Sequence, residues 1–149
     1  MLNFIDSQLD APSGRLVLNV FRGSELVEVF DEQNLIVVGS KQTHARLLGG
    51  DTANRPVTKF GVGTNGTAPA EGNTALTGPF VKAIDSVEYP ASNQVKFNFS
   101  LTSAEANGKA ILEFGLLTGG NVLYARKVRE AALNKDSDIS ISGSWTITF

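Results

Sequence analysis

A glycine-rich run in the middle of the chain is the closest match to a chemical motif. Gly61-Val62-Gly63-Thr64-Asn65-Gly66 has the G-x-G-x-x-G spacing of dinucleotide-binding loops, in which a helix N-terminus meets the pyrophosphate. That chemistry needs a helix to start inside the loop, and the following residues 67–74 include Pro69 and Gly72 and show no helical pattern. We therefore interpret the run as a strand end that continues into a surface loop, and we expect no cofactor.

Catalytic and metal sites need clusters of residues that this sequence does not show. His44 is the only histidine and there is no cysteine, so a zinc site lacks ligands. As a base, His44 would need an organising acid and a nucleophile beside it, and the sequence has neither a G-x-S-x-G elbow nor a cysteine, so a helix histidine that is hydrogen-bonded or solvent-exposed is the simpler interpretation. Asp136 and Asp138 lack the glycine and terminal Glu of a calcium loop. We predict no catalytic residues, no metal and no enzyme activity.

The net charge of the chain argues against nucleic-acid binding. The formal net charge is −2 and the pI is about 5.4, so no general basic field surrounds the protein. Arg126, Lys127 and Arg129 form a local basic cluster near Tyr124, which we expect to pair with acids of the chain or with a neighbouring subunit. The sequence also lacks a secretory signal pattern and the run of about 18 apolar residues that a membrane helix needs. We expect a soluble protein that folds in the cytoplasm and contacts neither nucleic acid nor membrane.

The elements that must position these residues are mostly strands. Alternating apolar and polar residues, interrupted by turn residues, predict strands at 15–21, 25–30, 35–38, 57–62, 80–89, 95–101, 110–117, 121–128 and 139–149. In the last of these, Trp145 and the final residue Phe149 fall on the apolar, core-facing side. One helix is expected from an N-cap at Ser40 to a stop at Gly49-Gly50.

This pattern predicts an all-β protein, namely a single-domain antiparallel β-sandwich of jelly-roll type with one short helix and an N-terminal arm. The chain of 149 residues fits one domain, which we place at residues 15–149. Residues 1–14 form the arm, because their apolar side chains are irregularly spaced and end in a Pro-Gly turn signal. We expect the arm to dock on a neighbouring subunit.

A long polar loop from Gly63 to Gly78 is the second candidate for partner contacts. It is rich in Gly, Thr, Ala, Asn and Pro, and a loop of this length in a compact domain is usually functional or packed against a neighbour. The predicted partner-contact residues are Leu2, Phe4, Ile5 and Leu9 of the arm, Thr64, Asn65, Thr67, Pro69 and Asn73 of the loop, and Arg126 and Arg129 of the basic cluster.

Several stretches resemble small virion proteins of tailed bacteriophages and prophages. These are residues 34–37 (NLIV), 45–50 (ARLLGG), 60–69 (FGVGTNGTAP), 73–76 (NTAL), 105–108 (EANG), 113–117 (EFGLL), 123–127 (LYARK) and 143–149 (GSWTITF). The resemblance covers about residues 15–149. Such proteins are often tail, tail-fibre or baseplate components, and no catalytic residues come with the resemblance.

The resemblance implies a structural protein of the virion, made in the host cytoplasm and placed in the tail fibre or baseplate. Its partners would be copies of itself, in a trimer or ring, and other virion proteins. A head-decoration or neck protein is the alternative within the virion. A carbohydrate-binding module is the alternative of another class, with a host-surface glycan as partner, and it would require an exposed Trp145 or Tyr124 for stacking on sugar.

Overall fold

The computed structural model describes residues 11–149, so the arm residues Leu2, Phe4, Ile5 and Leu9 lie outside the described part. In chain order the elements are β1 (Ser13–Arg22), β2 (Glu25–Ile36), α1 (Gly39–Leu48), β3 (Val57–Gly63), β4 (Phe80–Ala83), β5 (Ser86–Glu88), β6 (Gln94–Leu101), β7 (Ala110–Thr118), β8 (Leu123–Asn134) and β9 (Ile139–Thr148). β1 therefore starts at Ser13, slightly ahead of the expected start of the domain.

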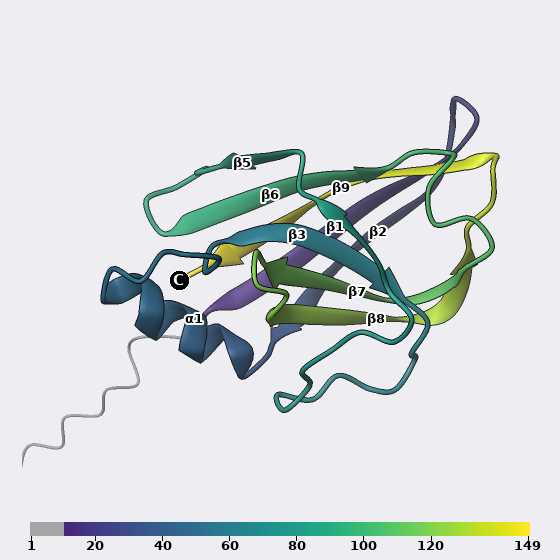
Figure 1. Cartoon of the computed structure of the whole chain (residues 1–149). Coiled ribbons are helices and arrows are strands. Elements are labelled where there is room, and N and C mark those ends of the chain that lie inside the picture. Colours follow the sequence, from purple (N-terminus) through teal and green to yellow (C-terminus); the bar gives the residue numbers. More distant parts are fainter. Residues whose placement is uncertain (1–10) are drawn as a thin grey trace, which may run out of the picture.

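All the strands within residues 11–149 belong to one antiparallel sheet. Its nine strands run in the order β4-β3-β7-β8-β2-β1-β9-β6-β5, which confirms the all-β antiparallel class with one short helix. The sheet is strongly curled into a half-barrel, whereas the sequence predicted two separate sheets (Figure 1). The difference arises at β2, which pairs with β1 up to Asn34 and then with β8 through Leu35 and Ile36.

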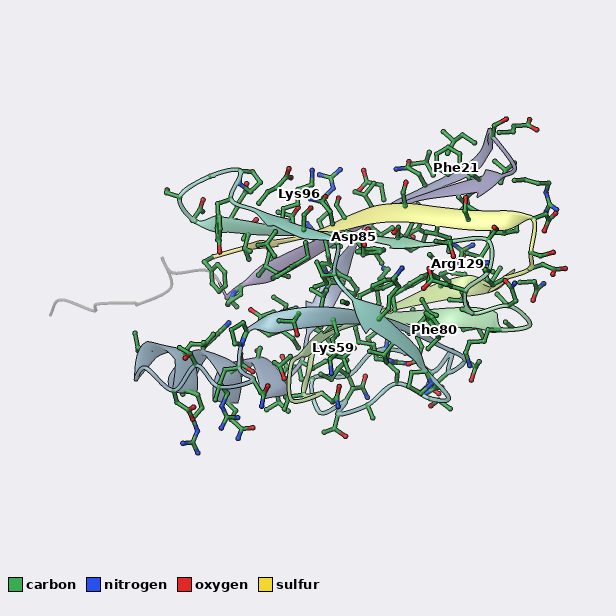
Figure 2. The ribbon with its side chains drawn as sticks, turned by 45° about the horizontal axis from the view of Figure 1, so that its top comes forward. Phe21, Lys59, Phe80, Asp85, Lys96 and Arg129 are labelled. Atoms are coloured by element: carbon green, nitrogen blue, oxygen red, sulfur yellow. The ribbon has the colours of Figure 1, made fainter. Side chains whose placement is uncertain are left out.

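The two edge strands of this sheet are neighbours in the chain. The sequence predicted one strand at 80–89, but β4 and β5 lie at opposite edges and only Ile84 and Asp85 separate them. The amide of Ile84 donates to the carbonyl of Thr58 at 2.9 Å, and the amide of Asp85 donates to the carbonyl of Asn98 at 2.8 Å. Asp85 lies between the half of the molecule with Lys59 and Phe80 and the half with Lys96 (Figure 2). Because the link contains neither glycine nor proline, the sequence pattern did not indicate this crossing.

The core lies in the concave interior of the curled sheet. Trp145 is 0% exposed, as the alternation of β9 predicted, and its indole N–H donates to Asn34 Oδ1 at 2.6 Å. Phe60 of β3 stacks on Phe99 of β6 with ring centroids 4.3 Å apart, so the core joins the two halves directly. The other fully or nearly buried members include Leu16, Leu18, Val20, Val62, Leu101, Ile111, Phe114, Leu116, Ile141 and Ile147.

Two local predictions at the same end of the molecule were wrong. The helix stops at Gly49-Gly50 as expected, but Ser40 is buried inside the helix, and Val38 precedes the first turn without a side-chain cap. Phe149 is 53% exposed, because β9 ends at Thr148 and the last residue is held by its backbone amide, which donates to the carbonyl of Asn93. The apolar face of β9 therefore ends at Ile147.

Because Trp145 is buried and Phe149 is half exposed, we expect their substitutions to change the free energy of unfolding by different amounts. We expect Trp145→Ala to lower the free energy of unfolding by about 3–5 kcal/mol, because it opens a cavity and leaves Asn34 without its donor. Phe149→Ala should cost less than about 1 kcal/mol, since the side chain is half exposed. Urea unfolding followed by circular dichroism measures both, and a larger loss in Phe149→Ala than in Trp145→Ala would contradict the assignment.

Candidate functional site

A buried ion pair lies on the outer face of β7 and β8. Arg126 Nε donates to Glu113 Oε1 at 2.9 Å, and the two side chains are 1% and 0% exposed. The pair sits in the middle of the β7–β8 ladder, where Arg126 is opposite Gly115 and Glu113 is opposite Val128. Two charges removed from water are stable together only when their remaining hydrogen-bonding groups also find partners.

The β3–β4 loop (residues 64–79) supplies those partners with four backbone groups and the side chain of Asn73. Arg126 Nη2 donates to the carbonyl of Asn65 at 3.0 Å, and Nη1 donates to the carbonyl of Thr67 at 3.0 Å and to Asn73 Oδ1 at 3.1 Å. Glu113 Oε2 accepts from the amides of Asn65 and Thr77 at 2.9 and 2.8 Å. The ion pair therefore holds the beginning, the middle and the end of the loop against the sheet.

The glycine-rich motif has a structural explanation in this arrangement. A Cβ atom on Gly63 would lie 2.5 Å from Glu113 Oε2, and one on Gly61 would lie 2.9 Å from Leu76 Cδ1. Leu76 of the loop is buried with Val37, Leu117 and Leu123 in a second, smaller apolar cluster. Among the described residues after Gly63 none is helical, as the sequence analysis expected. The two glycines therefore leave room for the loop and the ion pair on β3.

The five loop residues predicted to contact a partner divide into two groups. Thr64, Thr67 and Pro69 are exposed. Asn65 and Asn73 are half-buried and shape the loop, because their Oδ1 atoms accept from the amides of Thr67 and Ala70 at 3.0 and 2.9 Å. The loop thus exposes small side chains, and its backbone is held by Glu113 and Arg126 on the sheet.

The cations predicted as partner contacts pair with acids of the same chain. Besides the buried Arg126, Arg129 is largely buried and donates to both carboxylate oxygens of Glu28 at 2.7 and 3.0 Å, which lowers the pKa of Glu28. Lys127 bonds Glu32 at 3.2 Å. Lys127 and Arg129 lie over the ring of Phe30 and bridge β2 and β8 where their backbones no longer pair. The expected pairing of the basic cluster with acids of the chain is therefore observed, while its contact with a neighbouring subunit stays a prediction.

Glu113 is the site residue that sequence reasoning missed. Its signal was a single carboxylate inside the apolar run of β7, a position where a charge needs a buried partner. The partner is 13 residues away in the sequence, so only the strand pairing brings the two side chains together. Arg126 was identified, but as a contact for another subunit.

His44 joins α1 to the sheet. Its Nε2 is 2.7 Å from Tyr124 Oη, and its ring meets Tyr124 and Phe149 edge-on with centroids 5.4 and 5.5 Å apart. Burial lowers the pKa of His44 and raises that of Tyr124. This is the hydrogen-bonded helix histidine that the sequence indicated. Within residues 11–149, His, Asp and Glu side chains form no group that could hold a metal ion.

No protein-family model, curated protein or solved structure matches this chain. No helix among the described residues is both long enough and apolar enough to cross a membrane.

The buried ion pair predicts a specific pattern of stability losses. Arg126→Met should lower the free energy of unfolding by about 3–5 kcal/mol, because it leaves the Glu113 carboxylate buried without a cation. The double variant Arg126→Met, Glu113→Leu should lose less than that single variant, since no charge remains buried. Urea unfolding of the wild type and the two variants tests this, and a loss in the double variant that equals or exceeds that of Arg126→Met would contradict it.

The His44 contact predicts a pH dependence of stability. Because the folded-state pKa is below the ordinary value of 6.5, the unfolded chain binds a proton more readily, so stability is complete above about pH 6.5 and declines as the pH falls. His44→Gln removes this titration. The difference in urea midpoint between the wild type and His44→Gln should therefore shrink on acidification, and parallel curves for the two proteins would refute this origin.

Proposed function

We propose that this chain is a non-enzymatic structural subunit of a tailed-phage virion, in the tail fibre or baseplate, which acts by contacting copies of itself and other virion proteins. The β3–β4 loop, fixed by Glu113 and Arg126, is the observation that supports the proposal. The stretches that resemble phage virion proteins include residues 60–69 and 73–76, which form most of this loop, and both members of the ion pair.

A loop of this kind suits a contact between subunits for an energetic reason. Association costs conformational entropy for every backbone segment and long side chain that becomes ordered. Here the loop backbone is already held by four hydrogen bonds to Glu113 and Arg126, and the side chain of Asn73 accepts a fifth from Arg126. Its exposed residues, such as Thr67, Ala68, Pro69 and Ala70, carry short side chains that lose little freedom on binding.

The carbohydrate-binding alternative loses its two expected stacking residues. Trp145 lies in the core and Tyr124 is buried against His44, so neither ring is free to stack on a sugar. The head-decoration and neck alternatives use the same kind of subunit contact and differ only in the place within the particle. Antibody labelling of virions, viewed by electron microscopy, distinguishes them from the tail fibre or baseplate.

The loop contact can be tested on the purified protein. We expect the wild type to form a symmetric homo-oligomer, a trimer or ring, by multi-angle light scattering. Thr67→Arg adds a long charged side chain to the exposed face of the loop and leaves its carbonyl bonded to Arg126, so it should weaken assembly without changing the melting temperature.

Ser24→Arg is the matched control, because it places the same side chain on the exposed β1–β2 turn. If Thr67→Arg, Ser24→Arg and the wild type assemble equally well, the loop is not part of the contact between subunits. A wild type that stays monomeric, alone and with tail proteins, would overturn the proposed function.

A further inference from the structure

A groove of about 430 Å³ lies where the described chain enters the fold. One wall is formed by Ala11 and Pro12, and another by residues 36–38 at the end of β2. The remaining sides are residues of α1, including Lys41 and His44, and the part of the β3–β4 loop at Glu71 and Gly72. The groove thus has an apolar floor and a rim that carries both signs of charge.

The loop and the groove are parts of one surface. The carbonyl of Glu71 accepts from the amide of Val38 at 2.8 Å, so the fixed loop also sets the position of the groove wall. The side chain of Val38 is nevertheless 47% exposed, and Leu48 and Phe149 also expose apolar surface. Figure 1 places α1, the start of β1 and the C-terminus at this same end of the molecule. This end thus carries three of the nine large apolar side chains that are exposed in the described residues, and exposed apolar surface next to a groove is typical of an interaction site.

The N-terminal arm has the chemistry to fill this groove. The residues ahead of Ala11 include the apolar Leu2, Phe4, Ile5 and Leu9, together with two aspartates that could approach Lys41 on the rim. Ten residues in extended form reach at most about 33–36 Å, which is enough to cross to an adjacent molecule of this size. The arm can therefore contribute large side chains to a groove that is not its own.

Pro12 restricts the backbone at the point where the chain enters the groove wall. A residue before proline is confined to extended conformations, because the proline ring clashes with the α conformation at that position. Ala11 precedes Pro12 in the groove wall, so the chain lacks a tight turn at the point where it would have to fold back into its own groove. Ala11 therefore favours an extended path along the groove wall over a turn back into the groove.

We propose that this groove receives the N-terminal arm of a second copy of the chain, so that neighbouring subunits are joined by exchanged arms. The proposal rests on the proposed function as an assembly subunit and names the surface through which copies meet. Leu2, Phe4 and Ile5 supply the apolar contacts, and Val38 forms part of the wall that they cover.

The absence of cysteine from the sequence makes a cross-linking test direct. Phe4→Cys and Lys41→Cys are made in separate chains, mixed, and oxidised mildly. We expect a disulfide-linked heterodimer on a non-reducing gel, and no cross-link when Phe4→Cys is mixed with Ser24→Cys on the β1–β2 turn. Equal cross-linking to both partners, or none to Lys41→Cys, would overturn the proposal. An internal disulfide in the double variant Phe4→Cys, Lys41→Cys at high dilution would also overturn it, because the arm would then occupy its own groove.

A matched pair of valines provides an independent measurement. Val38 and Val87 are 47% and 46% exposed, but only Val38 lines the groove. Val38→Glu should weaken self-association about tenfold or more, since it places a charge on the surface that the arm covers. The fold should tolerate it, because an acid at the N-terminus of α1 is favourable. Val87→Glu on β5 should assemble like the wild type.

Light scattering separates the failure of this inference from the failure of the proposed function. If the wild type assembles and both Val38→Glu and a chain lacking residues 1–10 assemble equally well, the arm exchange is wrong while the assembly function stands. If the wild type assembles and both variants do not, while their melting temperatures are unchanged, the exchange is supported.

Discussion

The ion pair between Glu113 and Arg126 is the interaction on which the arrangement of this protein depends. Burying two charges costs more than their mutual attraction returns unless every remaining polar atom is also bonded. Here the remaining atoms are satisfied by the backbone of the β3–β4 loop, so the pair and the loop stabilise each other. Neither the pair without the loop nor the loop without the pair would be expected to keep this geometry.

The loop that the ion pair holds in place explains why the two halves of the curled sheet differ in the number of faces that they bury. β7 is buried on both faces, because the core covers one side and the loop with its Leu76 cluster covers the other. The half formed by β6, β9 and β1 has only one buried face, and its outer face carries Ser140, Ser142, Ser144 and Thr146 of β9. Each half follows the alternation rule for the number of faces that it buries.

The sequence predicted the strands well and their arrangement less well. The alternation of β9 placed Trp145 in the core, and the Gly49-Gly50 pair ended the helix, because both signals are local. The crossing at Ile84 and Asp85 and the joining of the two halves by β2 were missed, since an uninterrupted β-type sequence does not reveal where its pairing partner changes. Within the candidate site, the loop was found from its composition. Its anchor Glu113 was not found, because a buried carboxylate becomes meaningful only once the strand that bears Arg126 lies beside it.

The two edge strands, β4 and β5, have a consequence for how this protein behaves when crowded. A free sheet edge offers unpaired amides and carbonyls on which another chain can grow, and long, flat edges lead to amyloid-like stacking. Here the edges are a four-residue and a three-residue strand joined through Ile84 and Asp85, so each edge is short and held close to the other half of the molecule. Such edges give a foreign strand little length on which to nucleate. The longer stretch of backbone without a neighbouring strand on one side lies instead along β2, where only Leu35 and Ile36 pair with β8.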